Sequence, residues 1–227
     1  MNERGDLIAA SLREVKNRIQ LACQKAGRDP KEVTLISVTK NFPASDVQIL
    51  YDLGERNFGE NRDQEAREKS GALPSDAIWH FQGQIQSKKL RSITGWADVI
   101  HSLDDVGHAR KIAELLLEKS LPVFVQVSLD SPDGGEGRGG VQPDQLAVFL
   151  RECATIPGLE LAGLMAVAPL SVDPADAFSR LAAIRREVAV QFPQLKALSC
   201  GMSGDFESAI AAGATHIRIG SSILGSR

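Results

Sequence analysis

Thr34-Leu35-Ile36-Ser37-Val38-Thr39-Lys40 is a short, mostly apolar run that ends in a lysine and continues directly into Asn41-Phe42-Pro43. The run predicts a β-strand over residues 34–40 that stops before the proline. In α/β folds, the side chains at the carboxyl ends of strands line the place where ligands bind. Lys40, an amine at such an end, is therefore the first candidate functional group.

Seven further strand-like runs follow, at residues 57–61, 79–84, 98–102, 123–128, 159–167, 197–200 and 215–219. Helix-like segments separate the strands, the clearest at residues 44–53, 62–69, 86–92, 105–119 and 174–190. This alternation predicts parallel strands joined by right-handed crossovers, and eight units favour a single α/β domain, a closed (β/α)8 TIM barrel, over a doubly wound open sheet. The second and seventh strands are short, which leaves a seven-stranded or open sheet as the alternative.

The first 33 residues precede this repeat and follow a different pattern. Apolar residues recur at helical spacing from Leu7 to Cys23, and Gly27 followed by Asp29-Pro30 marks the end of the helix. A length of 227 residues suits one barrel and leaves little room for a second domain. We therefore expect one domain over residues 1–227, with an extra N-terminal helix and lead-in over 1–33 and the barrel over 34–227.

Charge and composition argue against several classes of protein. The net charge of -3 gives no broad basic field, so nucleic acid is not an expected partner, and the basic cluster at residues 87–91 indicates a solvated helix face. Cys23, Cys153 and Cys200 are far apart and lack metal-ligand spacing, which predicts reduced thiols in a cytoplasmic protein. The most apolar segment, residues 161–170, is too short to span a bilayer, so no membrane association is expected.

Two backbone-rich turns near the end of the chain resemble a phosphate cradle. Gly201-Met202-Ser203-Gly204-Asp205 follows the seventh strand, and Arg218-Ile219-Gly220-Ser221-Ser222 ends the eighth. Barrels commonly hold phosphate at these two loops, where free N–H groups and helix dipoles attract anions. Closure of the barrel would place Lys40 beside both turns, and an amine next to a phosphate cradle suggests pyridoxal 5'-phosphate. Taken singly, each feature also fits an ordinary turn or a solvated lysine.

An amine must lose its proton before it condenses with an aldehyde. Partial burial of Lys40 in the barrel mouth and a nearby guanidinium would both favour the neutral amine. Arg218 is the expected source of that positive charge.

The other motifs give weaker evidence of a functional site. The run Gly134 to Gly140 formally contains a dinucleotide fingerprint, but Pro132 before it and Pro143 after it leave no direct strand-to-helix turn, so we expect a flexible loop over the barrel mouth. His80 lies between Trp79 and Phe81 in a predicted strand and is interpreted as a structural histidine. The other histidines, at 101, 108 and 216, show no ligand spacing, so no metal site is expected.

Six motifs in order resemble the YggS-type pyridoxal phosphate homeostasis proteins. The likeness runs from residue 35 to residue 225, and the motifs are Val38-Thr39-Lys40, Phe58-Gly59-Glu60-Asn61, Trp79-His80-Phe81-Gln82-Gly83, Gly163-Leu164-Met165-Ala166, Gly201-Met202-Ser203-Gly204-Asp205 and Arg218-Ile219-Gly220. This resemblance implies a barrel like the amino-terminal domain of alanine racemase, with pyridoxal phosphate held as an internal aldimine (a Schiff base) on Lys40. It further implies phosphate ligands at Ser203, Gly220 and Ser221. Arg218 is expected near the ring nitrogen or the phosphate, and Asn61 and Met165 around the ring.

The expected function is cofactor binding and delivery, with no catalytic residue. An arginine at the ring nitrogen disfavours ring protonation and weakens carbanion stabilisation, and racemisation needs a second acid or base on the opposite face. The single tyrosine, Tyr51, lies in the helix after the first strand, where core packing is expected. We therefore predict a homeostasis protein without committed turnover. It would supply apo-enzymes that depend on pyridoxal phosphate, and the resemblance favours a monomer. The alternatives are a low-activity, racemase-like amino-acid enzyme and, more distantly, a phosphosugar Schiff-base aldolase.

Overall fold

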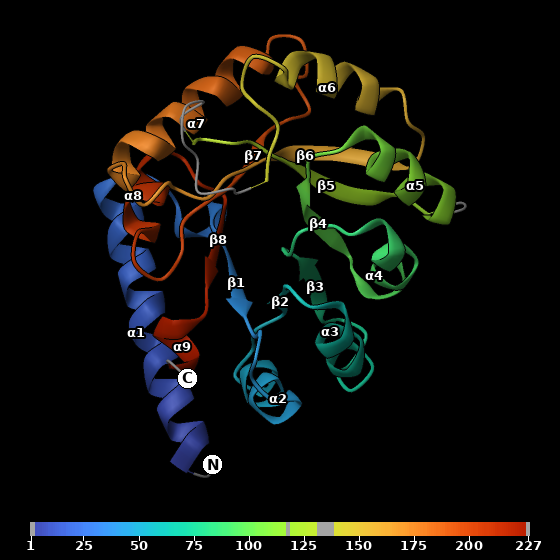
Figure 1. The fold of residues 1–227 in the computed structure, drawn as a ribbon. Helices are drawn as coiled ribbons and strands as arrows, with labels where there is room; N and C mark the ends of the chain where they lie inside the picture. Colours follow the sequence, from blue (N-terminus) through green and yellow to red (C-terminus); the bar gives the residue numbers. More distant parts are fainter. Residues whose placement is uncertain (1–2, 117–118, 131–138, 226–227) are drawn as a thin grey trace.

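The computed structural model describes residues 3–116, 119–130 and 139–225. Eight parallel strands form a closed barrel in the order β1 to β8 (Figure 1). The strands are β1 (Thr34–Val38), β2 (Asn57–Glu60), β3 (Ile78–Phe81), β4 (Val99–Leu103), β5 (Leu121–Gln126), β6 (Leu159–Met165), β7 (Ala197–Ser199) and β8 (His216–Ile219). The predicted (β/α)8 barrel is confirmed, and the open-sheet alternative is wrong because β1 pairs with β8.

Helices follow the strands and cover the outside of the barrel. They are α1 (Glu3–Lys25), α2 (Ala44–Asp52), α3 (Asp63–Ser70), α4 (Leu90–Trp96), α5 (Val106–Leu116), α6 (Leu146–Ala154), α7 (Pro174–Val188), α8 (Phe206–Ala211) and α9 (Ser221–Leu224), with short 3-10 turns η1 (Pro30–Glu32) and η2 (Ser87–Lys89). Within the described residues, no helix combines the length and apolarity that crossing a membrane requires.

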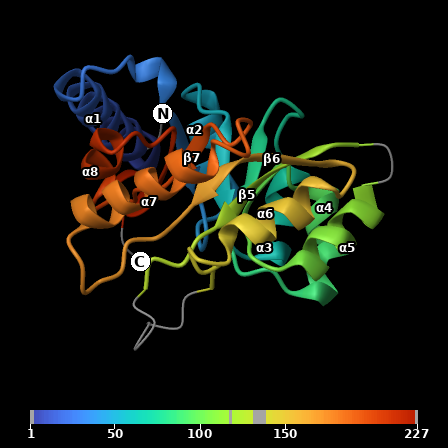
Figure 2. The same ribbon diagram turned by 90° about the horizontal axis from the view of Figure 1, so that it is seen from above.

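The expected N-terminal helix is present as α1, which lies along the outside of the barrel next to α8 and α9 (Figures 1 and 2). Ile8, Leu12, Val15 and Ile19 form its buried stripe, at spacings of three and four residues. At its start, the Arg4 guanidinium donates to the Asp46 carboxylate of α2 at 3.1 Å and to the Leu224 carbonyl of α9 at 3.0 Å. Helix α1 therefore joins the first and last helices of the barrel.

Two separate layers of side chains fill the protein. Outward-facing strand residues such as Phe58, Trp79 and Phe81 pack with the helices in one continuous apolar core. The barrel interior is more polar, because it holds His80, His101, His216, Ser199 and Arg218 together with Ile36, Phe124 and Met165. The interior can therefore hold charge and hydrogen bonds directly beneath the carboxyl ends of the strands.

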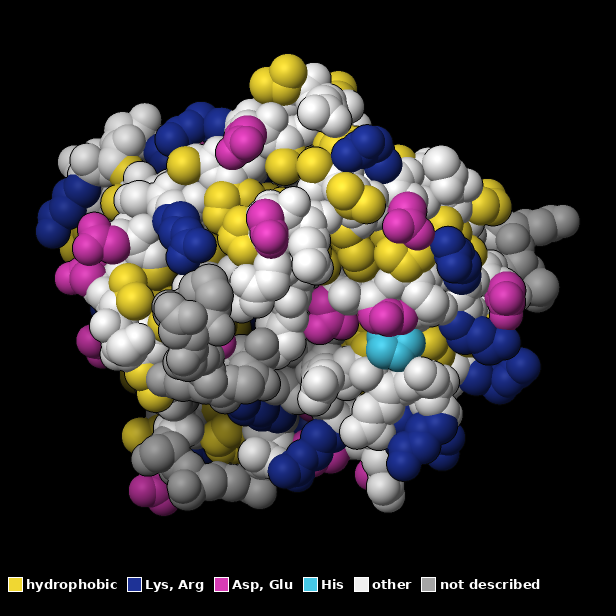
Figure 3. All heavy atoms as spheres, turned by 45° about the horizontal axis from the view of Figure 1, so that its top comes forward, with side chains coloured by type: hydrophobic (Ala, Val, Ile, Leu, Met, Phe, Trp, Pro, Cys, Tyr) yellow, Lys and Arg dark blue, Asp and Glu magenta, His cyan; other side chains and the backbone are white. Residues whose placement is uncertain are grey.

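The surface matches the small net charge. On the face drawn in Figure 3, acidic and basic side chains are interspersed with apolar and neutral groups, and no single sign of charge dominates.

A buried ion pair ties the end of β1 to α3. The Lys69 ammonium donates to the Glu60 carboxylate at 2.6 Å and to the Thr39 carbonyl at 2.8 Å, and the Thr39 hydroxyl donates to Glu60 at 2.6 Å. The Lys69 and Glu60 side chains are only 6% and 0% exposed. Burial raises the pKa of the Glu60 carboxyl, while the hydrogen bonds from Lys69 and Thr39 act in the opposite direction. Glu60 in the ionised form therefore depends on the lysine.

Lys69→Met should lower the free energy of unfolding by about 3–5 kcal/mol at neutral pH, because it leaves the Glu60 carboxylate buried without its cation. Urea denaturation measures the loss. The pKa of Glu60 in the folded variant would lie above its unfolded value, so the defect should shrink as the pH falls and the carboxyl takes up a proton. The double variant Glu60→Leu with Lys69→Met is the control and should lose much less. Equal losses in both variants would contradict the ion-pair explanation.

Candidate functional site

Pairing of the first and last strands sets the geometry of the barrel mouth. Ile36 lies opposite Arg218, and Ser37 lies opposite Ile219. One step further, Gly220 lies so close to β1 that a Cβ atom placed there would be 3.1 Å from the Val38 carbonyl oxygen. Lys40 is two residues beyond Val38, so Lys40 and the turn that follows β8 come from neighbouring strand ends, as barrel closure predicted.

Lys40 lies in a tight turn rather than in the strand. The strand ends at Val38, and the Phe42 N–H donates to the Thr39 carbonyl at 3.1 Å, which closes the turn around Lys40. Asn41 adopts a left-handed conformation with φ of 65°, and its N–H donates to the Glu65 carboxylate at 2.8 Å. The backbone that carries Lys40 is therefore held on both sides.

The Lys40 side chain is exposed, which corrects the expectation of partial burial. Within residues 3–116, 119–130 and 139–225, its ammonium has no hydrogen-bond or ion-pair partner. The physical reason is the turn, which carries Lys40 past the end of β1 and above the packed interior. The Lys40 side chain is therefore open to solvent.

The two expected phosphate turns contact each other directly. The Ser222 N–H of the eighth loop donates to the Ser203 hydroxyl of the seventh loop at 3.3 Å. The N–H groups of Ser203, Gly204 and Ser221 donate to no acceptor in the part of the chain that the structure describes. Ser203, Gly220 and Ser221 therefore lie in one region, with backbone donors left for an anion.

The helices that follow these two turns, α8 and α9, are short. Helix α8 has six residues and α9 has four, so each helix dipole adds less to anion binding than a full helix would. Anion binding at these turns would therefore depend mainly on the turn N–H groups and on Arg218.

Arg218 is a buried cation at the floor of the mouth. Arg218 is 6% exposed, and its guanidinium donates to the Ser199 hydroxyl at 2.8 Å and to the Ala166 carbonyl at 3.1 Å. No carboxylate among the described residues lies within ion-pair distance of it. Burial lowers the pKa of Arg218, yet the guanidinium stays protonated at neutral pH because its ordinary pKa exceeds about 12. An anionic or electron-rich ligand group would therefore be attracted to it.

Met165 and Asn61 come from opposite sides of the mouth. Met165 ends β6, lies opposite Ser199 of β7 and is 3% exposed. Asn61 follows β2, and its buried Oδ1 atom has no hydrogen-bond partner among the described residues. Asn61 also lines a cavity of about 270 Å³ with side chains from β3 and α4. Both positions are compatible with lining a ligand in the mouth.

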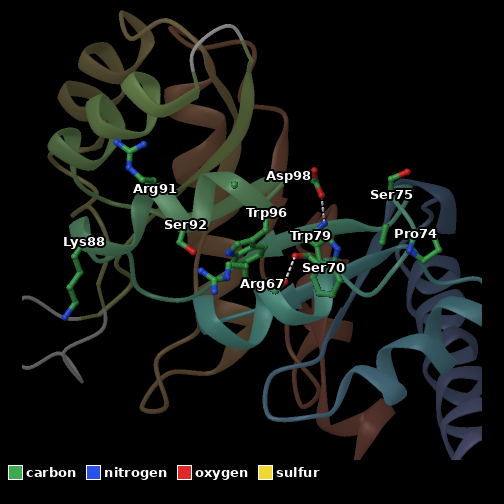
Figure 4. Close-up of a pocket in the computed structure, with 13 residues that line it drawn as sticks. Arg67, Ser70, Pro74, Ser75, Trp79, Lys88, Arg91, Ser92, Trp96 and Asp98 are labelled. Atoms are coloured by element: carbon green, nitrogen blue, oxygen red, sulfur yellow. Dashed lines mark hydrogen bonds between the residues drawn. The ribbon is translucent and has the colours of Figure 1, made fainter.

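A cavity of about 770 Å³ lies outside the barrel, between α3, α4 and the segments that lead into β3 and β4 (Figure 4). Arg67, Arg91 and Trp96 contribute to its wall, and all of the expected site residues lie elsewhere. Its strand residues come from the amino ends of β3 and β4, which is the end opposite the barrel mouth. Size alone therefore does not identify the functional site of this barrel.

The barrel interior brings together three histidines that the sequence analysis considered separately. The ring of His101 lies 5.0 Å from that of His80 and 6.1 Å from that of His216, and it stacks on Phe124 at 4.3 Å. His80 hydrogen-bonds to Asn57 and His101, so its predicted structural role is confirmed. The signal that could have grouped them is strand alternation, which puts every second residue inside the barrel. In the described parts of the chain, no group of three or more His, Cys, Asp or Glu residues is arranged to bind a metal.

The glycine-rich segment does not lead into a helix. Gly140 and Val141 are described, and Val141 forms a β-bridge with Val127. The next helix, α6, begins only at Leu146, so Gly140 does not lead directly into a helix, as the sequence predicted. The expected flexible loop over the mouth falls mostly on residues 131–138, outside the described residues.

Tyr51 lies away from the mouth. It packs partly against the apolar core, as predicted, and its hydroxyl donates to the Asp76 carboxylate at 2.5 Å. Asp76 precedes β3, at the amino end of that strand. Tyr51 therefore cannot act as a second acid or base opposite Lys40.

A closed eight-stranded barrel with a lysine after β1 and N–H-rich turns after β7 and β8 defines a barrel of the alanine racemase type. The chain belongs to the family described as "Alanine racemase, N-terminal domain", whose model matches residues 10–227. The pyridoxal phosphate homeostasis protein of Mycobacterium tuberculosis strain H37Rv is 38% identical, over 99% of this chain and 95% of that protein. The protein of the same name from Escherichia coli strain K12 is 34% identical, over 97% of each chain.

Solved structures agree with this assignment. PipY of Synechococcus elongatus PCC7942, solved with PLP bound, is 34% identical to this chain, with a TM-score of 0.83. The match covers 96% of this chain and 100% of PipY. Alanine racemase from Corynebacterium glutamicum has a TM-score of 0.68 at 16% identity, and the match covers 96% of this chain and 60% of that enzyme. The second comparison supports the shared fold.

Gly201→Ala should destabilise the protein and distort the seventh loop. Gly201 has φ of 91°, and an added Cβ would lie 2.6 Å from the Ala209 Cβ atom. Left-handed strain and overpacking together should cost about 2–4 kcal/mol in urea denaturation. Gly204→Ala, in the same turn but with no atom within 4 Å of its Cβ, is the control and should cost less than about 1 kcal/mol. Equal effects would show that the turn is not constrained at Gly201.

Proposed function

We propose that this chain binds pyridoxal 5'-phosphate at the barrel mouth and serves its homeostasis in the cell, without committed catalytic turnover. The observation that carries the proposal is the β1–β8 closure, which makes the strand ends that precede Lys40 and Ser221 neighbours. The proposal is that the Lys40 amine and the two turns, whose N–H groups lack acceptors among the described residues, serve one ligand. The PLP-bound structure of PipY, at 34% identity, supports the same ligand.

The residues present fit this cofactor. Ser203, Gly220 and Ser221 would hold the phosphate through backbone N–H groups and hydroxyls, and the Ser222 contact to Ser203 already brings the two turns together. Arg218 would face the ring nitrogen or the phosphate from the barrel floor. Met165 and Asn61 would line the ring, since one is apolar and the other has an unsatisfied amide oxygen. The cofactor itself would supply an aldehyde that forms a covalent bond with the Lys40 amine.

The groups around Arg218 favour storage over catalysis. A guanidinium at the ring nitrogen donates a hydrogen bond and disfavours ring protonation, so the cofactor would be a weak electron sink. A carboxylate in that place would have the opposite effect, and none among the described residues pairs with Arg218. Tyr51, the chain's one tyrosine, is bonded to Asp76 away from the mouth.

We further propose a monomer in the reducing cytoplasm that passes its cofactor to apo-enzymes. Burial raises the pKa values of Cys153 and Cys200 to about 12, so these thiols stay protonated and unreactive. An exposed Lys40 turn would let an acceptor reach the cofactor without opening the barrel. Transfer to a purified apo-enzyme tests this directly, and the absence of transfer above the rate of spontaneous release would contradict a delivery role.

Lys40→Ala should abolish the covalent bond while leaving non-covalent affinity for the phosphate. The visible absorption band of the bound cofactor should disappear, and borohydride reduction should no longer fix the cofactor to the protein. Lys88→Ala, which removes another exposed lysine outside the barrel, is the matched control and should behave as wild type. A persisting band in Lys40→Ala would mean that another amine carries the cofactor. Robust turnover of an amino acid by the wild type would instead favour the racemase-like alternative.

Ser203→Ala combined with Ser221→Ala should weaken retention of the cofactor and leave the fold intact. Each lost hydrogen bond to a charged group contributes about 1.5–3 kcal/mol, so the cofactor should dissociate at least about tenfold more readily. Dialysis followed by absorbance measures retention. Ser75→Ala, an exposed serine on the outer cavity, serves as the control. Unchanged retention in the double variant would place the phosphate elsewhere.

A further inference from the structure

A continuous hydrogen-bond chain crosses the barrel interior from β8 to β2. The Arg218 guanidinium contacts the Ser199 hydroxyl at 2.8 Å, and that hydroxyl contacts His101 Nδ1 at 2.8 Å. His101 Nε2 contacts His80 Nδ1 at 2.8 Å, and His80 Nε2 contacts the Asn57 Oδ1 atom at 3.0 Å. Ser199, His101 and His80 are at most 2% exposed. The proposed cofactor site includes none of these three residues.

The two ends of the chain fix the direction of every proton in it. A guanidinium only donates and an amide oxygen only accepts. His80 must therefore carry its proton on Nε2 and accept on Nδ1. His101 must in turn donate from Nε2 and accept on Nδ1, and the Ser199 hydroxyl donates to His101 while it accepts from Arg218. Every bond in the chain then points away from the cation.

Both histidines must be neutral for this pattern, since an imidazolium has no acceptor nitrogen. Burial, aided by the nearby charge of His216, lowers the pKa of His80 to about 3. Burial also lowers the pKa of His101 well below its ordinary value, with added repulsion from His80, Arg218 and His216. His216 contacts the Thr215 hydroxyl through Nδ1 at 2.9 Å, so it lies beside the chain rather than within it.

We infer that Ser199, His101 and His80 form a neutral, unidirectional hydrogen-bond chain that holds Arg218 in place of a carboxylate. Aligned dipoles stabilise the buried cation without cancelling its charge, because no carboxylate among the described residues forms an ion pair with Arg218, and Asp205 acts on it only through a longer-range attraction. The three are positioning residues: they orient Arg218 and keep its full charge directed to the barrel mouth. The effect of that charge on a ligand rests on the proposed cofactor function. The hydrogen-bond chain itself is formed entirely by the protein's own residues and does not depend on a ligand.

The first test uses the protein without cofactor. Nitrogen-15 NMR of histidine-labelled wild type should show His80 and His101 as neutral Nε2–H tautomers that do not titrate between about pH 5 and 8, the range over which a free imidazole changes charge. His80→Gln and His101→Gln assign the signals. An Nδ1–H tautomer or an imidazolium at either ring would overturn the inference, whether or not the cofactor binds.

The second test asks whether the chain positions Arg218 for the cofactor. Ser199→Ala breaks the chain at Arg218 and should raise the dissociation constant of pyridoxal phosphate about tenfold and shift the visible band, with Lys40 still labelled by borohydride. Ser199→Thr keeps the hydroxyl and should stay within about threefold of wild type. A purely structural serine would change urea stability in the alanine variant but leave affinity and absorption band unaltered, and that result would overturn the inference.

The two proposals can fail separately. If wild type binds no pyridoxal phosphate while both histidines show the Nε2–H tautomer, the cofactor proposal falls and the chain stands. If wild type binds the cofactor and Ser199→Ala binds it equally with an unchanged spectrum, the positioning role falls and the cofactor proposal stands.

Discussion

The pairing of β1 with β8 is the constraint on which the rest of this structure depends. Without it, the turn that carries Lys40 and the turn that follows Arg218 would lie at opposite ends of an open sheet, nearly two hundred residues apart in sequence. With Ile36 opposite Arg218, the strand ends become neighbours, and a Cβ atom added at Gly220 would lie 3.1 Å from the Val38 carbonyl oxygen, a contact that β1 would have to relieve by a small shift. Helix α1 reinforces the closure from outside, since it contacts both α2 and α9.

The protein treats two buried cations in opposite ways, and the difference follows from their positions. Lys69 lies between the barrel and α3, where it meets the Glu60 carboxylate, and the pair fixes the base of the Lys40 turn. Arg218 lies inside the barrel, where it meets only a hydroxyl and a carbonyl among the described residues. A charge whose task is to hold structure is neutralised, because an unpaired buried charge is destabilising. Arg218, the cation proposed to attract a ligand, is instead stabilised by the dipoles of the Ser199 hydroxyl and the Ala166 carbonyl.

The sequence predicted the barrel because its signals are local: alternating strands and helices, and turn residues at strand ends. Lys40, Ser203 and Gly220 could be proposed for the same reason, since each follows a recognisable strand. Contacts that depend on barrel register could not be predicted. The His80 to His101 hydrogen bond joins two strands whose relative shift no spacing in the sequence reveals. The exposure of Lys40 was missed too, because β1 ends at Val38, two residues before the predicted strand end, and a turn closed by the Phe42 N–H and the Thr39 carbonyl follows.

The arrangement of the barrel interior bears on how one small domain would hold a reactive aldehyde under the proposed function. The buried imidazoles of His80 and His101 are linked through Ser199 to the Arg218 cation, and the turns after β7 and β8 contact each other at the strand ends. In the proposed function, this hydrogen-bonded interior would hold Arg218 in one orientation beneath the cofactor. Catalysis would require a proton donor facing Lys40 and a protonated ring, and an uncompensated guanidinium on the floor opposes the second requirement. The same residue that would make binding favourable would therefore keep the bound cofactor chemically quiet.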